Sequence, residues 1–232
     1  MLSRILLFCL LPTALFTNED RCLDLNANDE PEKTLELCSG FLLSDTLETQ
    51  ARAIALEKRG IAHRELGNSE QSIVDLGASI ALSQDTSVMR MLAWTYREAK
   101  RYEDAEALYS RVLESDKHEQ GWLSRCVVRQ DLGRYQDALS DCKQALSLDN
   151  DNLDTLFFTA RVHSILEQPK YALPLAKRAM ALAPNDPRHL VEYVWALHQM
   201  GWTNVAFDKA TAGLKSFPNN PELILFLRET NK

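Results

Sequence analysis

Residues 119–152 have the sequence EQGWLSRCVVRQDLGRYQDALSDCKQALSLDNDN, which divides into two helical halves around a glycine. In the second half, Leu139, Cys142 and Ala145 follow one another at intervals of three residues, so these side chains fall on one face of a helix. Gly133 stands where the first helix has to end, and glycine fits the left-handed backbone of a helix cap. The stretch therefore predicts two helices of about 13–14 residues joined by a tight turn.

Small residues recur through the chain at nearly constant spacing. Ala105, Ala138, Ala172 and Ala206 are separated by 33, 34 and 34 residues, and Ser72 lies 33 residues before the first of them. A fixed period of this length is typical of a repeat array, in which each helical pair contacts only its neighbours. Such an array has no central cavity, so its function is expected on a surface. This favours a binding protein over an enzyme.

The predicted helix ends lie at a constant distance from the small residues. Five residues before each of them comes a position where a helix would end: Gly67, Lys100, Gly133, Glu167 and Gly201. Prolines that stop a helix close the last two units, and no stretch alternates with the period of a strand. The predicted units cover residues 53–85, 86–118, 119–152, 153–186 and 187–220.

The unit quoted above resembles a tetratricopeptide repeat. It carries the family's tryptophan at Trp122 and its turn glycine and tyrosine at Gly133 and Tyr135. The packing alanines of the family are Ala138 and Ala145. The resemblance implies an all-α fold, a right-handed α-solenoid of helix-turn-helix repeats whose first helices line a concave surface. It also implies that a protein or peptide binds on that surface.

The units depart from the family pattern in places. Arg125 and Cys126 stand where the family often has leucine and glycine, and Asn150 stands where it ends a unit with proline. In the fourth unit, Pro174 falls inside the second helix, where a proline removes one backbone hydrogen bond and costs about 3 kcal/mol. We expect that helix to start late or to kink at the proline.

The two ends of the chain differ from the repeats. Residues 221–232 start with Pro221, a favourable first helical residue, and predict a capping helix over the last hydrophobic face. Residues 1–17 have a basic start and a short apolar core, the layout of a secretory signal peptide, with cleavage after Ala14 or Thr17. The signal peptide predicts an exported protein, periplasmic or secreted. The alternative is a core helix at the start of a cytoplasmic protein.

Four cysteines form two pairs with one spacing: Cys22 with Cys38 and Cys126 with Cys142, each 16 residues apart. Because the chain of the quoted unit folds back midway between them, Cys126 and Cys142 are expected to face each other. A disulfide needs a Cα separation of about 5–6 Å. The same spacing predicts a bridged, degenerate hairpin in residues 18–52. Buried free thiols in a reducing compartment are the alternative, and the signal peptide favours the disulfides.

Composition and motifs argue against several classes of function. The chain has 232 residues, 45% of them hydrophobic, and a net charge of −7, which disfavours binding to nucleic acid. No second hydrophobic run suits an integral membrane span after leader removal, and no linker divides the array. No phosphate-binding loop, HExxH, GxSxG or Rossmann fingerprint occurs. Five histidines are scattered and the cysteines lack CxxC spacing, so we expect no catalytic site, no metal and no cofactor.

The residues expected to bind a partner lie on the first helices, on the side turned away from the second helix. Arginine and tryptophan are the residue types most often found as interface anchors. The predicted surface is locally basic, which favours an extended peptide that is acidic or ends in a carboxylate. The alternative for the aromatic residues is packing against the neighbouring hairpin. The predicted peptide-binding residues are Arg64, Arg90, Trp94, Arg97, Val127, Phe157, Arg161, Trp195 and His198.

Together these observations favour an exported scaffold that binds a protein or peptide through its concave surface. Two alternatives stay open. One is a self-associating structural module, in which exposed end helices form a homo-oligomer. The other is a regulatory subunit of a separate enzyme.

Overall fold

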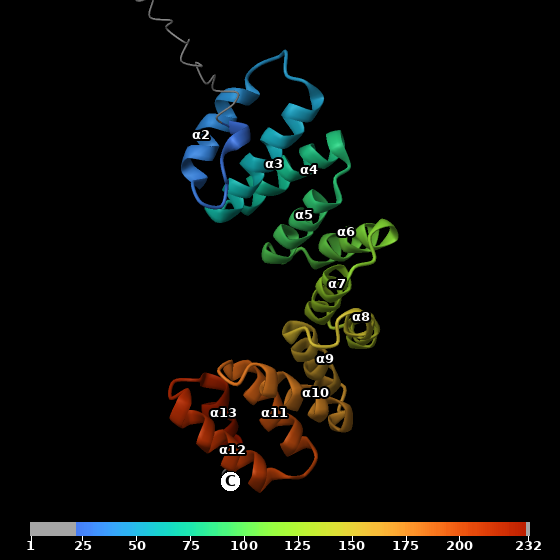
Figure 1. Ribbon diagram of the computed structural model, residues 1–232, viewed down its shortest axis with the longest axis vertical. Helices are drawn as coiled ribbons and strands as arrows, with labels where there is room; N and C mark the ends of the chain where they lie inside the picture. The colour runs from blue at the N-terminus through green and yellow to red at the C-terminus, as the bar shows by residue number, and fades with distance from the viewer. Residues whose placement is uncertain (1–21, 231–232) are drawn as a thin grey trace, which may run out of the picture. The chain divides into compact units, whose positions relative to one another are not determined.

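The computed structural model describes residues 22–230, which are mostly helical and contain no strand (Figure 1). This confirms the all-α class and the helix-turn-helix repeats expected from the sequence. The described residues form two compact units, one ending at Met91 and the other beginning at Leu92, and the boundary falls inside one helix. The predicted signal peptide at residues 1–17 lies outside the described residues.

Consecutive helices pair as hairpins in both units. The first unit contains α2 (Pro31–Leu42), α3 (Thr49–Glu65), α4 (Ser69–Ser83) and the start of α5 (Thr86–Glu98). The second unit contains the rest of α5 and the helices α6 (Tyr102–Ser115), α7 (Glu119–Asp131), α8 (Tyr135–Leu148), α9 (Leu153–Ile165), α10 (Pro169–Leu182), α11 (Pro187–Gln199), α12 (Thr203–Ser216) and α13 (Pro221–Thr230). The helix pairs from α3–α4 to α11–α12 correspond to the five expected repeats.

The small residues that set the repeat spacing lie where the two helices of a hairpin touch. Each of them has 0% of its surface exposed, and the set comprises Ser72, Ala105, Ala138, Ala172 and Ala206. The side chains at a helix–helix contact set the distance between the helix axes. The small residues therefore fix how closely the two helices of each hairpin approach.

The five turns inside the hairpins share one backbone conformation. The residue predicted to end each first helix has a positive φ: 77° at Gly67, 59° at Lys100, 71° at Gly133, 56° at Glu167 and 81° at Gly201. In every turn the next N–H donates to the carbonyl oxygen five residues earlier, at 2.8–3.0 Å. This is the hydrogen bond of a Schellman cap, which satisfies a carbonyl group left over at the helix end. The predicted caps are confirmed, including the two without glycine.

The proline in the fourth repeat does not delay its helix. α10 begins at Pro169, ahead of Pro174, and continues through it to Leu182. Pro169 stands in the first turn, where a missing N–H leaves no intrahelical hydrogen bond unmade. Of the two alternatives expected for this helix, a late start or a kink, the late start is therefore wrong.

Both predicted disulfides are present. Cys22 is bonded to Cys38 with a Cα–Cα distance of 4.9 Å, and Cys126 to Cys142 with 5.4 Å. All four cysteines are fully buried. In the first pair, residues 22–24 form a helical turn that is bridged to α2, and Pro31 starts α2. The bridges connect the two helical segments of a hairpin at equivalent places.

In each of two hairpins, α3–α4 and α7–α8, an arginine of the first helix pairs with an aspartate of the second helix. Arg59 donates to Asp75 through two nitrogen atoms, both at 2.7 Å, and Arg125 donates to Asp141 through two nitrogens at 2.8 Å. Each pair spans 16 residues, as the disulfides do, and the two aspartates are almost completely buried. Arg129 donates a third hydrogen bond to Asp141 at 2.8 Å. Two-pronged arginine–carboxylate pairs of this kind fix geometry as well as charge.

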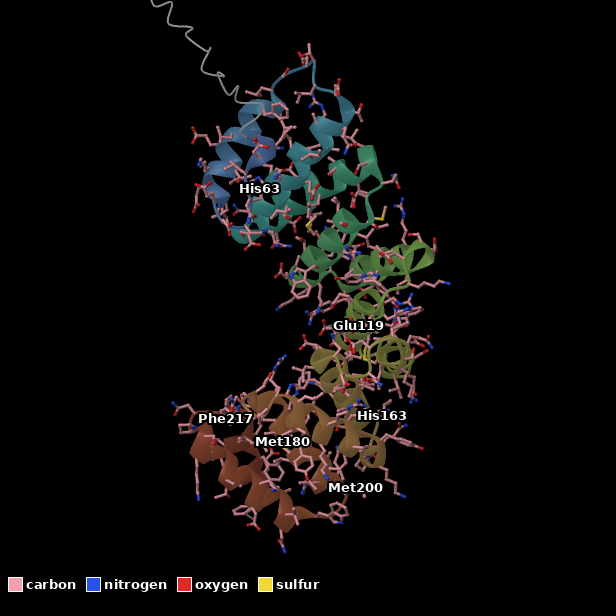
Figure 2. All side chains as sticks on the ribbon, in the orientation of Figure 1. His63, Glu119, His163, Met180, Met200 and Phe217 are labelled. Carbon is pink, nitrogen blue, oxygen red and sulfur yellow. A yellow bond between two sulfur atoms is a disulfide. The ribbon has the colours of Figure 1, made fainter. Side chains whose placement is uncertain are left out.

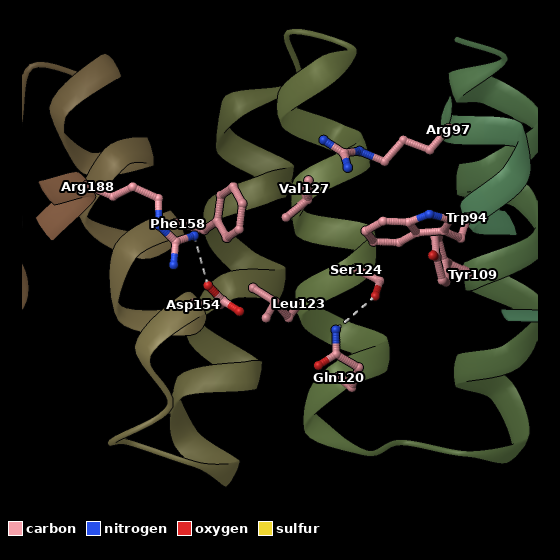
Figure 3. Close-up of a pocket in the computed structure, with 10 residues that line it drawn as sticks. All are labelled: Trp94, Arg97, Tyr109, Gln120, Leu123, Ser124, Val127, Asp154, Phe158 and Arg188. Atoms are coloured by element: carbon pink, nitrogen blue, oxygen red, sulfur yellow. Dashed lines mark hydrogen bonds and ion pairs between the residues drawn. The ribbon is translucent and has the colours of Figure 1, made fainter. Parts of the chain in front are cut away.

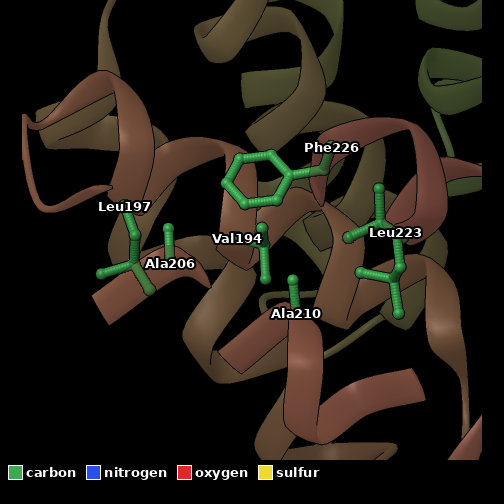
Figure 4. Packing of buried hydrophobic residues seen from close by; sticks show 7 residues of the cluster. Val194, Leu197, Ala206, Ala210, Leu223 and Phe226 are labelled. Atoms are coloured by element: carbon green, nitrogen blue, oxygen red, sulfur yellow. The ribbon is translucent and has the colours of Figure 1, made fainter. Parts of the chain in front are cut away.

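The C-terminal helix closes the last hydrophobic face, as predicted. Leu223 and Phe226 of α13 have no exposed surface. Figure 4 shows them packed beside Val194 of α11 and Ala210 of α12. The helix therefore covers side chains that the next repeat would cover inside the array.

Replacing Lys100 by glycine is expected to raise the free energy of unfolding by about 0.5–1 kcal/mol. The reason is that Lys100 has a φ of 59°, a backbone conformation in which the Cβ atom of any other residue clashes with the backbone. Glycine has no Cβ and adopts this φ without the clash. Urea unfolding measures the difference. Lys100→Ala is the control, because it removes the side chain and keeps the Cβ. Equal stabilisation by both variants would show that the backbone conformation is not the cause.

Reduction is expected to add four hydrogen atoms to the intact mass of protein purified without reductant, two for each bridge. Mass spectrometry checks this. The double variant Cys126→Ala/Cys142→Ala is expected to take up two hydrogens and to lose about 3 kcal/mol of unfolding free energy, because its unfolded chain is no longer closed into a loop. An unchanged mass after reduction contradicts both bridges.

Candidate functional site

Three neighbouring pockets in the second unit share lining residues and so form one groove. The N-terminal pocket has a volume of about 240 Å³, the middle pocket about 320 Å³ and the C-terminal pocket about 250 Å³. The N-terminal and middle pockets share Arg97, Val127 and Phe158. The middle and C-terminal pockets share Arg161 and Ile165. The groove follows the first helices of successive repeats, from α5 through α7 and α9 to α11.

The N-terminal pocket has an apolar floor between two aromatic side chains. Figure 3 shows Leu123 and Val127 of α7 between Trp94 of α5 and Phe158 of α9. Both aliphatic side chains are buried, whereas Trp94 keeps 43% of its surface exposed. A large aromatic ring left open beside an apolar floor is an unusual arrangement for a side chain that only packs internally.

The helical period explains which residues face the groove. On α7, Gln120, Leu123 and Val127 are three or four residues apart and lie on one face of the helix. Arg125 and Cys126 fall on another face, where they bond to α8. The contacts within the hairpin therefore fix the rotation of α7 and present the first set of residues to the groove.

Most charges beside the groove are paired. Arg97 lies 2.6 Å from Asp131, and Arg188 lies 3.2 Å from Asp154. Arg188 also donates to Asp186 and thereby lowers the pKa of that carboxyl group. Among the described residues, Arg161 has no carboxylate within 4.0 Å. The groove is therefore less basic than its arginine content indicates.

One buried carboxyl group lines the C-terminal pocket. Glu192 of α11 keeps only 8% of its surface exposed. Burial raises its pKa to about 7, with Arg161 acting in the opposite direction and Glu222 of α13 adding to the increase. Glu192 makes no hydrogen bond within residues 22–230. A carboxyl group in this state is neutral below about neutral pH and charged above it.

The structure brings five of the predicted binding residues to the groove and leaves four outside the three pockets. Those that line it are Trp94, Arg97, Val127, Arg161 and Trp195. Arg64 and Arg90 belong to the first unit, and Phe157 and His198 lie beside the groove among packed side chains.

The two aromatic rings outside the pockets have internal contacts. Phe157 is 7% exposed, and its ring centroid lies 5.1 Å from that of Phe158 and 6.1 Å from that of His189. His198 forms a hydrogen bond with Thr203 at 3.1 Å and has its ring 5.6 Å from that of Phe226. These contacts match the packing alternative considered for the aromatic residues.

Several groove residues were missed by the sequence reasoning. On α9 the missed residues are Asp154, Phe158 and Ile165, which form a stripe along the groove with the predicted Arg161, at spacings of four, three and four residues. That spacing is visible in the sequence and indicates Phe158 in place of its neighbour Phe157. Other missed residues are Gln120, Gln130, Arg188, Glu192, Gln199 and Glu222.

No metal-binding cluster of three or more His, Cys, Asp or Glu side chains occurs within residues 22–230. Figure 2 labels one of the histidines of the second unit, His163. His163 of α9 is buried, stacks on Tyr171 and bonds to Gln168, and burial lowers its pKa. In the same part of the chain, no helix has the length and apolar character needed to span a membrane.

Replacing Glu192 by glutamine is expected to stabilise the protein at about pH 8 and much less at about pH 4. The pKa of Glu192 in the folded protein is about 7, above its ordinary value of 4.5. The folded state therefore loses stability as the pH rises through this interval, by up to about 3 kcal/mol. Glutamine keeps the size of the side chain and carries no charge at either pH.

Urea unfolding at the two pH values measures this effect. The exposed Glu103 of α6 provides the control variant Glu103→Gln, which should change the unfolding free energy little at either pH. The same stabilisation by Glu192→Gln at both pH values would contradict the raised pKa.

Comparison with known proteins gives a family match and several similar structures. The family model of the tetratricopeptide repeat matches residues 86–115, which contain α5 and α6. A tetratricopeptide repeat protein from Parabacteroides merdae has a similar structure, with a TM-score of 0.76 and 14% identity over 92% of this chain and 84% of that chain. No curated protein matches the chain.

Structures of MamA proteins are also similar. MamA from Desulfovibrio magneticus, from residue 41 to its end, has a TM-score of 0.68 and 12% identity over 73% of this chain and 97% of that chain. Another MamA crystal structure has a TM-score of 0.65 and 15% identity over 73% of this chain and 92% of that chain. At such identities the likeness concerns the fold alone. Residues 86–115 therefore match a tetratricopeptide repeat, and the chain shares the helical-repeat fold of these structures.

Proposed function

We propose that the chain is a protein-binding module that holds an extended segment of another protein in the groove along α5, α7, α9 and α11. The observation that carries the proposal is the continuity of the groove, since each pocket shares lining residues with the next. Three connected pockets suit a ligand that runs along successive repeats. A small compact ligand would need only one of them.

Side-chain amides along the groove support an extended ligand. Gln120, Gln130 and Gln199 line the N-terminal, middle and C-terminal pockets respectively. Each donates one hydrogen bond within the protein, and no side-chain oxygen of the three accepts one from the described residues. A bound backbone has N–H groups that need acceptors once water is displaced. The amides lie on two first helices, α7 and α11, and place one such acceptor in each of the three pockets.

Trp94 is the strongest candidate for an anchor. Its exposed ring stands beside the apolar floor of the N-terminal pocket, and Arg97 lies over it with Cζ 5.8 Å from the ring centroid. Aromatic side chains beside a pocket carry much of the binding energy in protein interfaces. Because Arg97 and Arg188 are paired with aspartates, the case for an acidic partner is weaker than the sequence indicated.

We extend the proposal to the compartment. Disulfides persist in oxidising compartments, and the first residues have the layout of a secretory signal peptide. The chain is accordingly proposed to be an exported scaffold, periplasmic or secreted, without catalytic activity of its own. The thiol state measured by intact mass bears directly on this part of the proposal.

Peptides selected from a random phage-displayed library on the full-length chain provide ligands for a direct test. The double variant Trp94→Ala/Gln120→Ala is expected to bind them more weakly by roughly tenfold or more, because it removes an exposed aromatic anchor and a side-chain amide of the N-terminal pocket. Fluorescence anisotropy with the labelled peptides measures the affinities.

The matched control is Trp202→Ala. Trp202 is 50% exposed but lies in the turn between α11 and α12, so its replacement should leave the affinity unchanged. Sedimentation of each variant reports the oligomeric state. Wild-type affinity in the double variant rejects the groove, and loss of an oligomer with binding retained favours the self-associating alternative.

A further inference from the structure

Glu192 is a largely buried residue whose carboxyl group borders a cavity and has no partner among the described residues. Its side chain is more than nine-tenths buried and lines the C-terminal pocket. Within residues 22–230 it makes neither a hydrogen bond nor an ion pair closer than 4.0 Å. Buried carboxyl groups in proteins are normally paired, because an uncompensated charge in a low-dielectric site is costly. The open side of Glu192 faces a space that a ligand can enter.

A second carboxylate lines the same pocket. Glu222 stands in the first turn of α13, where the helix N-terminus favours a negative charge. It is close enough to Glu192 to add to the increase in the pKa of that group. The two acidic side chains come from different helices, α11 and α13, and meet at one end of the groove.

One arginine opposes the two acids without pairing with either. Arg161 of α9 lines the pocket, and its Cζ lies 5.8 Å from the ring centroid of Phe157. When Glu192 is ionised, the pocket carries two negative charges and one positive charge from these three side chains. A cationic ligand group would balance that charge, whereas an acidic group would add a third carboxylate.

The walls of the pocket suit a long side chain that ends in a charge. Trp195 and Val191 of α11 provide apolar surface beside the carboxyl groups. Trp195 is held edge-on against Phe226 of α13, with the ring centroids 5.0 Å apart. Lysine and arginine combine an aliphatic stem with a cationic end, and both interact favourably with aromatic rings.

We propose that the C-terminal pocket is a subsite for a lysine or arginine side chain of the bound segment, whose cation lies between Glu192 and Glu222 and whose stem lies along Trp195. This proposal rests on the proposed function, because it assigns one position of the segment held in the groove. It names the chemistry of the partner at that position, a basic residue.

A small probe tests the subsite independently of any peptide. N-acetyl-lysine amide is titrated into the full-length chain at about pH 8, where Glu192 is ionised, and the indole N–H signal of Trp195 is followed by NMR. The lysine probe is expected to shift this signal. N-acetyl-norleucine amide has the aliphatic stem without the charge and is expected to leave the signal unchanged. Glu192→Gln is expected to weaken lysine binding roughly tenfold or more, and Arg161→Gln to strengthen it.

The outcomes separate the subsite from the function of the groove. Equal responses to lysine and norleucine, or a response to N-acetyl-glutamate amide that Arg161→Gln removes, would overturn the subsite. The subsite would be rejected, and the groove retained, if the library-selected peptides contain no basic residue and bind Glu192→Gln with the same affinity as the wild type. Failure to select any peptide would reject the proposed function, and the lysine probe would still report on the pocket.

Discussion

The close contact between the two helices of each hairpin is the constraint on which the rest of the structure depends. Small buried residues such as Ala138 set the distance, and a left-handed cap such as Gly133 sets the turn that brings the helices together. The Cys126–Cys142 bridge and the Arg125–Asp141 pair then span the same gap. Together they fix the rotation of α7, and this rotation decides which of its side chains face the groove.

The fold was largely predictable because its determinants are local and recur with the repeat. The turn at Glu167 was predicted although no glycine stands there, because Glu167 occupies the same place in the repeat as the glycines of other turns. The disulfides followed from the symmetry of a hairpin about its turn. The expected alternatives for α10 were a late start or a kink at Pro174, and the late start is wrong because the helix begins at Pro169, where a proline leaves no intrahelical hydrogen bond unmade.

The groove was predictable only as a face of the first helices. The face was found on α5, where Trp94 and Arg97 line a pocket, but on α9 the projection chose Phe157, one residue away from Phe158. An error of one residue turns a side chain by about 100° around the helix axis, which is enough to move it from the groove to the core. Charge was also hard to predict, because Arg97 pairs with an aspartate 34 residues away in the next repeat.

The placement of the disulfides has a mechanical consequence. Each bridge closes within one hairpin, so covalent cross-links hold a repeat together without tying it to its neighbours. If tension were applied to the two ends, the segments inside the bridges, residues 22–38 and 126–142, would stay closed. Each bridge spans 16 residues of chain and shortens the fully stretched polypeptide by about 50 Å. One repeat and the N-terminal hairpin therefore each contain a segment that cannot be extended unless its bridge is broken.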